Sequence, residues 1–424
     1  MENLAPSEKL ILDHSQAAEL AERFGTPLYV IDEQCFRNRI RHYLAAFRAA
    51  APSVTLTFAS KANSLIQILK IAHEEGCLID VASEGELRAA LHAGIPASDC
   101  HFHGNAKGRT ELQFAIKSGI GQIMVDNFQE LNWHIKHQTP SELMFRLAPG
   151  VDPKTHEAIS TGQADTKFGF NIGDGSALKA VKMALDAKLN VHGFHCHVGS
   201  QLLDPEAQRV GAMQLAQFAI DIYNQTQFLT KELNFGGGLG VEYVRGESPI
   251  SIDEYCESVC RPVLDLLAPT PIKPVITQEP GRSLIGEQGV TLYQVLAKKT
   301  VPTVNGEKTY LSVDGGLSDN PRVVLYGAKY TVLNASRSSD QMSTFTVSGK
   351  HCETDTLFAD VQLPADTEPG DYIQVLCTGA YNTMMSSNYN RFLRPPTVLI
   401  TSSDEPKIIQ RRESFEDLFA RELN

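Results

Sequence analysis

Lys61 lies in the segment FASKAN, directly after an apolar stretch that is typical of a buried strand. A lysine amine that is removed from water has a lowered pKa and can form a Schiff base with an aldehyde. Most loop lysines are simply solvated, and that interpretation stays open for Lys61 on this segment alone. The buried strand before it nevertheless favours a reactive amine at a strand end.

Two other segments could bind phosphate or carboxylate groups. GGGLG at 236–240 offers backbone amides that can approach a phosphate closely. It is not a dinucleotide fingerprint, since Val241 stands where the third glycine would fall. EPGR at 279–282 supplies the carboxylate of Glu279 and the guanidinium of Arg282, which can clamp an anion through two parallel hydrogen bonds.

A third segment, HVGSQ at 197–201, adds an imidazole and a hydroxyl. His197 can stack on a flat ring, and Ser200 can donate to a phosphate. A lysine, a phosphate-binding turn, a stacking ring and a carboxylate together fit pyridoxal 5′-phosphate better than any other cofactor.

Histidines on one strand also raise the possibility of a metal site. His195 and His197 alternate along a strand and therefore point to one face, as two ligands would. Only Asp80 and His103 can be added to them as further ligands. Since barrel hydrolases need more inward His and Asp ligands, we expect no catalytic metal, and we expect His195 to be a core or supporting residue.

These candidate residues fall at the carboxyl ends of predicted strands. Short β-branched runs alternate with helical patterns, with strands at 54–59, 77–82, 100–103, 121–125, 142–147, 190–197, 231–235 and 274–278. Helices are predicted at 64–75, 84–93, 109–118, 127–137, 175–188, 206–229 and 252–268. The pattern predicts a TIM-like (β/α)8 barrel, whose loops build an active site at that end. A doubly wound sheet would account for six or seven of the units equally well.

The pattern changes after about residue 283. Period-2 strands at 292–302, 308–313, 343–349, 372–377 and 396–401 are separated by Gly, Pro and Asn turns, and a short acidic helix near 412–422 follows. We predict an α/β barrel over 34–283 and an all-β domain formed by 1–33 plus 284–424. The segment 26–32 is expected to pair with that β domain.

Composition excludes several other classes of protein. The 424 residues are 42% hydrophobic and 21% charged, which is typical of a globular protein of two or three domains. The net charge of −12 and the lack of a basic tract indicate neither a nucleic-acid nor a membrane partner. Eight dispersed cysteines favour neither a zinc site nor disulfides, and with no signal-like N-terminus they indicate the cytoplasm.

A series of motifs in one order resembles the fold-type III pyridoxal-phosphate decarboxylases, and within them the diaminopimelate decarboxylase family. The motifs are FASKAN, DVASEGEL, FHGNAK, KFGF, HCHVGSQ, GGGLG, EPGRSL, DGGLSDNPRVVLYGA and KHCETD. The resemblance implies a carboxy-lyase of lysine biosynthesis that converts meso-2,6-diaminopimelate to L-lysine and carbon dioxide. It also implies a barrel followed by a β domain.

The resemblance assigns roles around the cofactor. Lys61 would carry it as a Schiff base, His197 would stack on its ring, and Glu279 would face the ring nitrogen. An ionised carboxylate keeps that nitrogen protonated, so the ring can accept the electron pair left by carbon dioxide. The arginine of the related alanine racemases weakens this effect. The remaining cofactor-binding residues would be Asp80, Ser200, Gly237, Gly238, Gly281, Arg282 and Tyr381.

The resemblance also implies how the substrate is chosen. Arg322 and Tyr326, with Arg282, would hold a distal carboxylate, Glu353 would take the distal ammonium, and Tyr381 would also bind the substrate. Ornithine decarboxylases bind a distal amine and need no such clamp. A decarboxylase of ornithine, arginine or a D-amino acid is the alternative, and a non-catalytic cofactor-binding homologue is another.

Cys352 and Glu353 resemble the pair that the family supplies from the second subunit of a homodimer. The cysteine would deliver a proton to the α-carbon after decarboxylation. The family commonly reads Cys-Glu-Ser-Gly-Asp, whereas this chain has Cys-Glu-Thr-Asp, one residue shorter. The role of Asp355 is therefore open. Asn382-Thr383-Met384-Met385 also departs from the usual small and hydroxyl residues, and we expect it to alter packing rather than the reaction.

Overall fold

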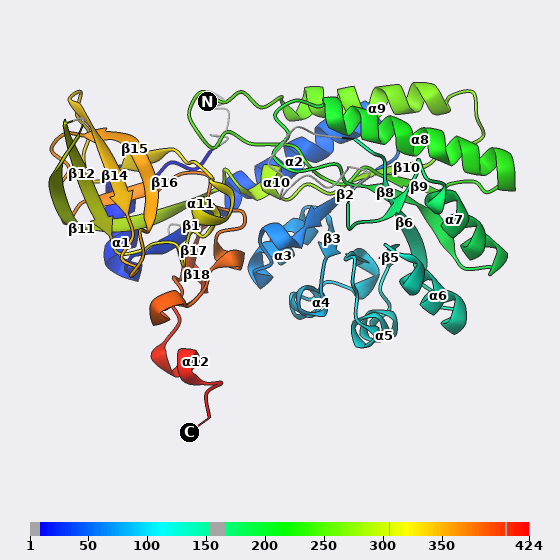
Figure 1. The fold of residues 1–424 in the computed structure, drawn as a ribbon, viewed down its shortest axis with the longest axis horizontal. Coiled ribbons are helices and arrows are strands. Elements are labelled where there is room, and N and C mark those ends of the chain that lie inside the picture. The colour runs from blue at the N-terminus through cyan, green and yellow to red at the C-terminus, as the bar shows by residue number, and fades with distance from the viewer. Residues whose placement is uncertain (1–8, 152–165, 305, 403–404, 424) are drawn as a thin grey trace. The chain divides into compact units, whose positions relative to one another are not determined.

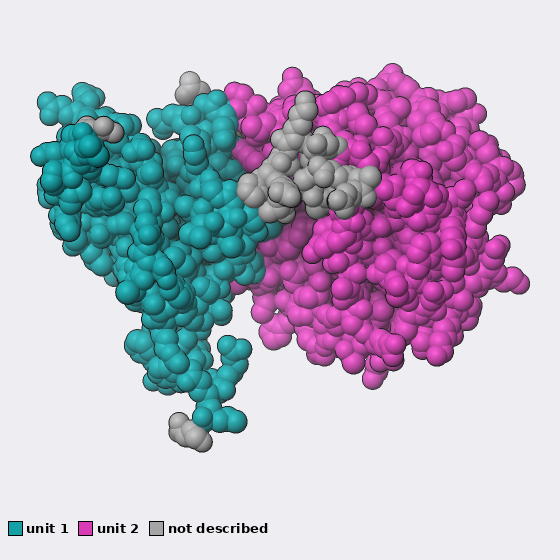
Figure 2. All heavy atoms as spheres, viewed as in Figure 1, with its two compact units in different colours: residues 1–38, 242–247, 285–424 teal, residues 39–241, 248–284 magenta. Residues whose placement is uncertain are grey.

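The computed structural model, drawn in Figure 1, divides into two units, which Figure 2 colours separately. It describes residues 9–151, 166–304, 306–402 and 405–423. Unit 1 comprises Met1–Asn38, Glu242–Glu247 and Ile285–Asn424, and unit 2 comprises Arg39–Val241 and Ser248–Leu284. The hexapeptide 242–247 thus belongs to unit 1, although it lies between segments of unit 2 in the sequence.

Unit 2 is a closed barrel of eight parallel strands. The strands are β2 (Val54–Ala59), β3 (Leu78–Val81), β4 (Cys100–Phe102), β5 (Gln122–Val125), β6 (Glu142–Ala148), β8 (Val191–Cys196), β9 (Glu232–Asn234) and β10 (Val275–Gln278). They follow the order β5-β4-β3-β2-β10-β9-β8-β6, and pairing of β5 with β6 closes the ring. The predicted barrel is confirmed, and closure excludes the doubly wound alternative. A two-residue strand, β7 (Phe170–Asn171), adds to β6.

Helices accompany the barrel strands, and all but the first and the last of them match the helices that the hydrophobic periodicity predicted. They are α2 (Glu33–Ala50), α3 (Ile66–Glu74), α4 (Glu84–His92), α5 (Arg109–Ser118), α6 (Phe128–His137), α7 (Ser176–Asp186), α8 (Glu206–Thr226), α9 (Ile252–Leu267) and α10 (Arg282–Ile285). The hydroxyl of Ser83 accepts from Glu86 N at 3.2 Å and caps α4, as expected. Among the helices of the described chain, none is long and apolar enough to span a lipid bilayer.

Unit 1 is built around a mixed sheet that includes the N-terminal strand. Its strands are β1 (Leu28–Asp32), β11 (Gly289–Thr303), β12 (Gly306–Val313), β13 (Val332–Asn334), β14 (Met342–Ser348), β15 (Thr356–Pro364), β16 (Tyr372–Val375), β17 (Thr397–Ile400) and β18 (Lys407–Gln410). β1 pairs antiparallel with β11 and parallel with β17, which confirms the pairing expected for 26–32. The helices are α1 (His14–Phe24), α11 (Arg322–Tyr326) and α12 (Phe415–Phe419).

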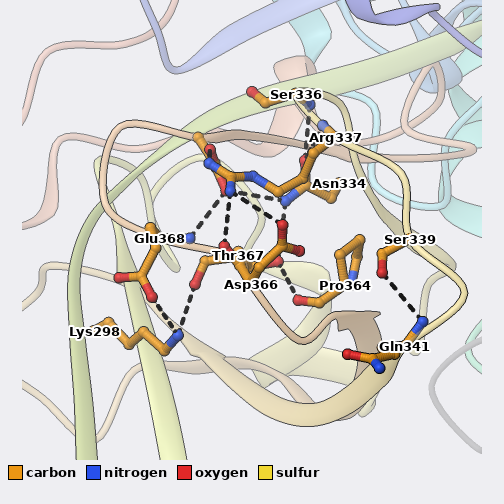
Figure 3. A network of polar contacts seen from close by, with 11 residues as sticks. Lys298, Asn334, Ser336, Arg337, Ser339, Gln341, Pro364, Asp366, Thr367 and Glu368 are labelled. Atoms are coloured by element: carbon orange, nitrogen blue, oxygen red, sulfur yellow. Dashed lines mark hydrogen bonds and ion pairs between the residues drawn. The ribbon is translucent and has the colours of Figure 1, made fainter.

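A polar network ties the loops of unit 1 together (Figure 3). Lys298 on β11 donates to the Thr367 carbonyl at 2.9 Å and to Glu368 Oε1 at 2.7 Å. Asn334, at the end of β13, donates to Thr367 Oγ1 at 3.1 Å, while Arg337 donates to the Asp366 carbonyl at 2.9 Å. These contacts hold the loop after β15 against β11 and against the segment that follows β13.

Candidate active site

Lys61 lies at the carboxyl end of a barrel strand, in the 3-10 turn Ser60–Ala62 that follows β2. Its Nζ is 3.5 Å from Oδ2 of Asp80, the residue before the last one of β3. The lysine side chain is 47% exposed, whereas Asp80 is buried. The amine is therefore held by one carboxylate and stays accessible to a ligand.

Glu279, just after β10, is a buried carboxylate surrounded by N–H donors. Asn234 Nδ2 donates to its Oε1 at 2.7 Å, and His103 Nε2 lies 3.0 Å from the same oxygen. His195 Nε2 lies 3.3 Å from Oε2. Burial opposes ionisation, but His103 and His195 outweigh it and hold the pKa of Glu279 well below its ordinary value. A buried carboxylate is thus kept charged.

A continuous line of contacts connects Lys61 with Glu279. Asp80 Oδ1 lies 3.7 Å from His103 Nε2, so Asp80 stands between the lysine and the histidine that contacts Glu279. The rings of His103 and His195 meet edge to face, with centroids 5.0 Å apart. Burial lowers the pKa of His195 to about 4, against the opposing effect of Glu279.

His197 follows β8 at the same end of the barrel and is partly buried. Burial, then the positive charges of Lys61 and Arg146, lower its pKa well below the ordinary value. A neutral imidazole can stack on a flat ring without bringing a charge against its face. Two further strand-end residues pair with each other, since Arg146 Nε lies 3.9 Å from Asp126 Oδ1.

The phosphate-binding groups expected from the sequence lie at neighbouring strand ends of this barrel. Arg282 Nη2 donates to Ser200 Oγ at 3.1 Å. In the turn after β9, a Cβ on Gly237 would lie 2.3 Å from the Glu279 carbonyl, and Gly238 has φ +139°, so neither position accepts a side chain. A Cβ on Gly281 would lie 2.9 Å from Ala62 Cβ, so this glycine lets the turn before Arg282 approach the turn of Lys61.

The groups at the strand ends around Lys61 and Glu279, which we call the strand-end cluster, fit pyridoxal 5′-phosphate. An accessible amine, an ionised carboxylate and a neutral imidazole match an aldehyde, a ring nitrogen and a ring face. A side-chain-free glycine turn beside a guanidinium matches a phosphate. These features come from residues at the ends of four strands, β2, β8, β9 and β10, which are neighbours in the barrel sheet although they are far apart in the sequence.

Three of the buried side chains around Glu279 could also bind a metal ion. Ligand atoms of His103, His195 and Glu279 lie within 4.8 Å of one another, a grouping that could hold an ion. The sequence suggested His195, His197, Asp80 and His103, and the observed set differs because it contains Glu279 and lacks Asp80 and His197. One Glu279 oxygen already accepts from Asn234 and His103, and the contacts with His103 and His195 account for the ionised carboxylate.

Arg322 occupies a separate polar site in unit 1, at the start of α11. It is buried, and its Nη1 donates to Tyr330 Oη at 2.7 Å. Its guanidinium carbon lies 4.9 Å from the ring centre of Tyr243 and 5.9 Å from that of Tyr381. Burial opposes its charge, but Tyr243 and Tyr330 raise its pKa further above the ordinary value. Arg322 is a fixed cation in an aromatic setting.

Sequence reasoning missed two of the tyrosines around Arg322 and one partner of Glu279. Tyr243 lies in the hexapeptide 242–247, and Tyr330 follows the motif that contains Arg322. Tyr326, expected beside Arg322, lies at the other end of α11 and is partly exposed. Asn234 could have been recognised as a site residue from its place at the end of a predicted strand, just before the glycine turn.

Cys352 and Glu353 lie together in a loop of unit 1, and both are exposed. Cys352 N donates to Asn390 Oδ1 at 3.0 Å, and the Tyr389 hydroxyl donates to Glu353 Oε1. Cys352 is the exposed member of the eight free thiols. The predicted residues thus form one cluster in unit 2, around Lys61 and Glu279, and two in unit 1, around Arg322 and around Cys352.

A barrel with this strand-end cluster is the architecture of pyridoxal-dependent decarboxylases. The family model described as "Pyridoxal-dependent decarboxylase, pyridoxal binding domain" matches residues 37–286. The diaminopimelate decarboxylase of Bacillus subtilis is 39% identical over 96% of this chain and 93% of its own. That of Halalkalibacterium halodurans is 40% identical over 94% and 92%. The chain belongs to the diaminopimelate decarboxylase family.

A solved structure agrees with these sequence relatives. The diaminopimelate decarboxylase of M. jannaschii, in complex with L-lysine, has a TM-score of 0.90 and 31% identity. The match covers 99% of this chain and 97% of that one. The similarity therefore includes both units and is not confined to the barrel.

Proposed function

We propose that this chain decarboxylates meso-2,6-diaminopimelate to L-lysine and carbon dioxide, with pyridoxal 5′-phosphate bound at the strand ends of the barrel. The observation that carries the proposal is the buried, ionised Glu279, connected through His103 and Asp80 to the amine of Lys61. The relatives at about 40% identity over nearly the whole chain support the choice of substrate.

When bound, the cofactor supplies a ring that accepts the electron pair released as carbon dioxide leaves. Lys61 would hold its aldehyde carbon, and the ionised Glu279 carboxylate would keep the ring nitrogen protonated. His197 covers a ring face as a neutral imidazole. Ser200, Gly237, Gly238, Gly281 and Arg282, with Tyr381 and Asp80, complete the cofactor site.

The substrate's distal end is bound by groups of opposite charge. Arg322, with Tyr326 and Arg282, binds the distal carboxylate, Glu353 binds the distal ammonium, and Tyr381 also binds the substrate. Because Arg322 is fixed by Tyr330 before any ligand arrives, little side-chain entropy is lost when the carboxylate binds. A substrate that lacks this carboxylate leaves a buried cation unpaired, which selects against ornithine.

The proton that replaces the carboxylate comes from Cys352. The bond between the α-carbon and the carboxylate carbon breaks, carbon dioxide leaves, and the thiol proton at Sγ passes to the α-carbon. Solvent returns a proton to the thiolate, so one proton is consumed per turnover. We place Cys352 and Glu353 of each subunit in the site of the other, in a homodimer. The cytoplasmic location expected from the dispersed cysteines is part of the same proposal.

The test is lysine formation from meso-2,6-diaminopimelate by the purified full chain, with and without added pyridoxal phosphate, beside an ornithine control. Cofactor-dependent lysine with no product from ornithine is the expected result. Product from ornithine would retain the cofactor and Lys61 but overturn the roles of Arg322 and Glu353. No product from either substrate, with the cofactor bound, would favour a non-catalytic homologue.

A further inference from the structure

We propose that Asp355, His351 and Tyr389 form a positioning relay that holds Cys352 and Glu353 in their working orientation. The proposal deepens the function proposed above and rests on it for the roles of Cys352 and Glu353. It also gives a role to Asp355 in the shortened Cys-Glu-Thr-Asp loop. All five residues belong to unit 1.

Asp355 is the buried anchor of this relay. Its Oδ1 accepts from Leu317 N at 3.0 Å, and its Oδ2 accepts from His351 N at 3.0 Å. His351 Nδ1 lies 2.6 Å from the same Oδ2, so the ring nitrogen donates to it as well. Three N–H donors on one buried carboxylate fix both ends of the turn that carries Cys352 and Glu353.

The backbone around Asp355 is shaped for this contact. The Asp355 carbonyl accepts from Gly349 N at 2.8 Å, and Asp355 itself has φ +32°. A Cβ on Gly349 would lie 2.1 Å from Asp355 Oδ2, so a side chain at 349 would displace the carboxylate. The loop thus closes on itself through Asp355, with one residue fewer than the family commonly uses.

His351 is held by Asp355 and packs against two aromatic residues. Its side chain is buried, and its ring lies nearly parallel to that of Tyr389, at 10° with centroids 5.7 Å apart. On another side the ring of Phe392 meets it edge-on, with centroids 4.9 Å apart. A ring fixed by Asp355 at Nδ1 and enclosed by two aromatic rings has little freedom to rotate.

Tyr389 completes the relay at Glu353. Its hydroxyl donates to Glu353 Oε1, and the next residue, Asn390, accepts from Cys352 N at 3.0 Å. Exposed glutamates ordinarily sample several rotamers, and ordering one on binding costs side-chain entropy. A hydrogen bond from a tyrosine that is stacked on His351 lowers this cost. The relay therefore acts on substrate binding through Glu353 and on proton delivery through the position of Cys352.

The first variant is Tyr389→Phe, which removes the hydroxyl and keeps the ring on His351. We expect KM for meso-2,6-diaminopimelate to rise about tenfold with kcat within about twofold, since a hydrogen bond to a charged group is lost but the Cys352 loop stays in place. Tyr310→Phe, on β12 of the same unit, is the matched control and leaves both constants unchanged. An unchanged KM in Tyr389→Phe would overturn the role of Tyr389.

The second variant is Asp355→Asn, which replaces one accepting oxygen with a donor. Cys352 is the exposed thiol, so its alkylation by iodoacetamide, followed by peptide mass spectrometry, reports its position without turnover. We expect the alkylation rate at Cys352 to change at least about threefold and kcat to fall about tenfold or more. Asp360→Asn, at an exposed aspartate of β15 with φ +54°, is the matched control.

The readouts separate failure of the relay from failure of the proposed function. If the wild-type chain makes no lysine, the proposed function fails, while the alkylation rates still test whether Asp355 positions Cys352. If the wild type is active but Asp355→Asn keeps both its alkylation rate and its kinetics, the relay is wrong. If Asp355→Asn does not fold, Tyr389→Phe still decides whether Glu353 is positioned as stated.

Discussion

The side-chain amide of Asn234 donates a hydrogen bond of 2.7 Å to Glu279 Oε1. The two residues are brought together by strand register, because Asn234 pairs with Thr277 where β9 runs beside β10. Asn234 also accepts from Gly236 N at 2.8 Å, so one amide orients both the carboxylate and the glycine turn. A single residue therefore links the part of the site expected to face the ring nitrogen with the part expected to face the phosphate.

We expect Asn234→Asp to raise the pKa of Glu279, because a second carboxylate would repel its charge. Glu279 would then become protonated at higher pH, and the acid limb of the kcat profile would move to higher pH by about one unit or more. The measurement is kcat against pH for both enzymes. Asn190→Asp, at an exposed loop position, serves as the control. An acid limb that stays in place would contradict the assigned role of Asn234.

Lys61→Ala should remove the visible absorption band of the lysine-bound cofactor and reduce kcat by about a thousandfold or more, since the reactive amine is gone. An absorption spectrum of the protein after incubation with pyridoxal phosphate checks this. Lys70→Ala, at an exposed lysine of α3, should keep the band. Persistence of the band in Lys61→Ala would show that another amine carries the cofactor.

Arg322→Ala should lower kcat/KM for meso-2,6-diaminopimelate about a hundredfold, because a charged hydrogen-bond clamp for the distal carboxylate is lost. Tyr330→Phe, which removes the 2.7 Å contact to Arg322, should have a smaller effect of about tenfold. Steady-state kinetics give both values, and Arg261→Ala on the surface of α9 is the control. Kinetics of Arg322→Ala equal to the wild type would favour a substrate without a distal carboxylate.

Elemental analysis of the purified chain should find no stoichiometric metal, and a chelator should leave lysine formation unchanged. The physical reason is that Glu279 Oε1 is already taken by Asn234 and His103. One bound metal ion per chain, lost together with activity in the variant His195→Gln, would instead establish the His103–His195–Glu279 grouping as a metal site.

Asp319 should make unit 1 less stable as the pH rises. Burial, assisted by Asp314 and opposed by the Gly316 N–H, raises its pKa from 3.8 to about 7. Because the folded state binds this proton more tightly than the unfolded state, the stabilisation is complete below about pH 4 and is lost as the pH rises through 7. The loss amounts to at most about 4 kcal/mol.

The variant Asp319→Asn tests this pH dependence, since an amide keeps an acceptor for Gly316 N and Tyr293 Oη. We expect its Tm to exceed that of the wild type at pH 8 and the difference to shrink toward pH 5. Thermal unfolding at several pH values gives the comparison, with Asp360→Asn as the control. A difference that is independent of pH would contradict the raised pKa.

Most of the barrel could be predicted from the sequence because buried parallel strands are short apolar runs bounded by turns. The predicted strand 54–59 coincides with β2, and helix 109–118 coincides with α5. Strands β13 and β18 of unit 1 were missed, since three or four residues carry too few alternations to show a period. β15 was also missed, because exposed residues follow one another in its middle and break the alternation.

The positions of Lys61, Glu279 and Arg282 at the strand ends of the barrel could be predicted, because each lies in a motif that directly follows a predicted strand. Contacts between residues that are far apart in the sequence could not be predicted. Tyr243 meets Arg322 only because the hexapeptide 242–247 folds with unit 1, and His195 meets Glu279 only through the order of strands in the barrel. Such contacts depend on the complete fold and leave no local pattern in the sequence.

The first strand of the chain is completed by some of its last residues, since Tyr29 on β1 lies beside Thr397 on β17. During synthesis the barrel segments leave the ribosome long before β17 is made. While unit 2 forms, β1 therefore lacks the neighbour that β17 later provides. Contacts of such long sequence separation slow folding and leave a strand edge exposed. We therefore expect a nascent chain stopped near residue 390 to be the form of this protein that most needs chaperones.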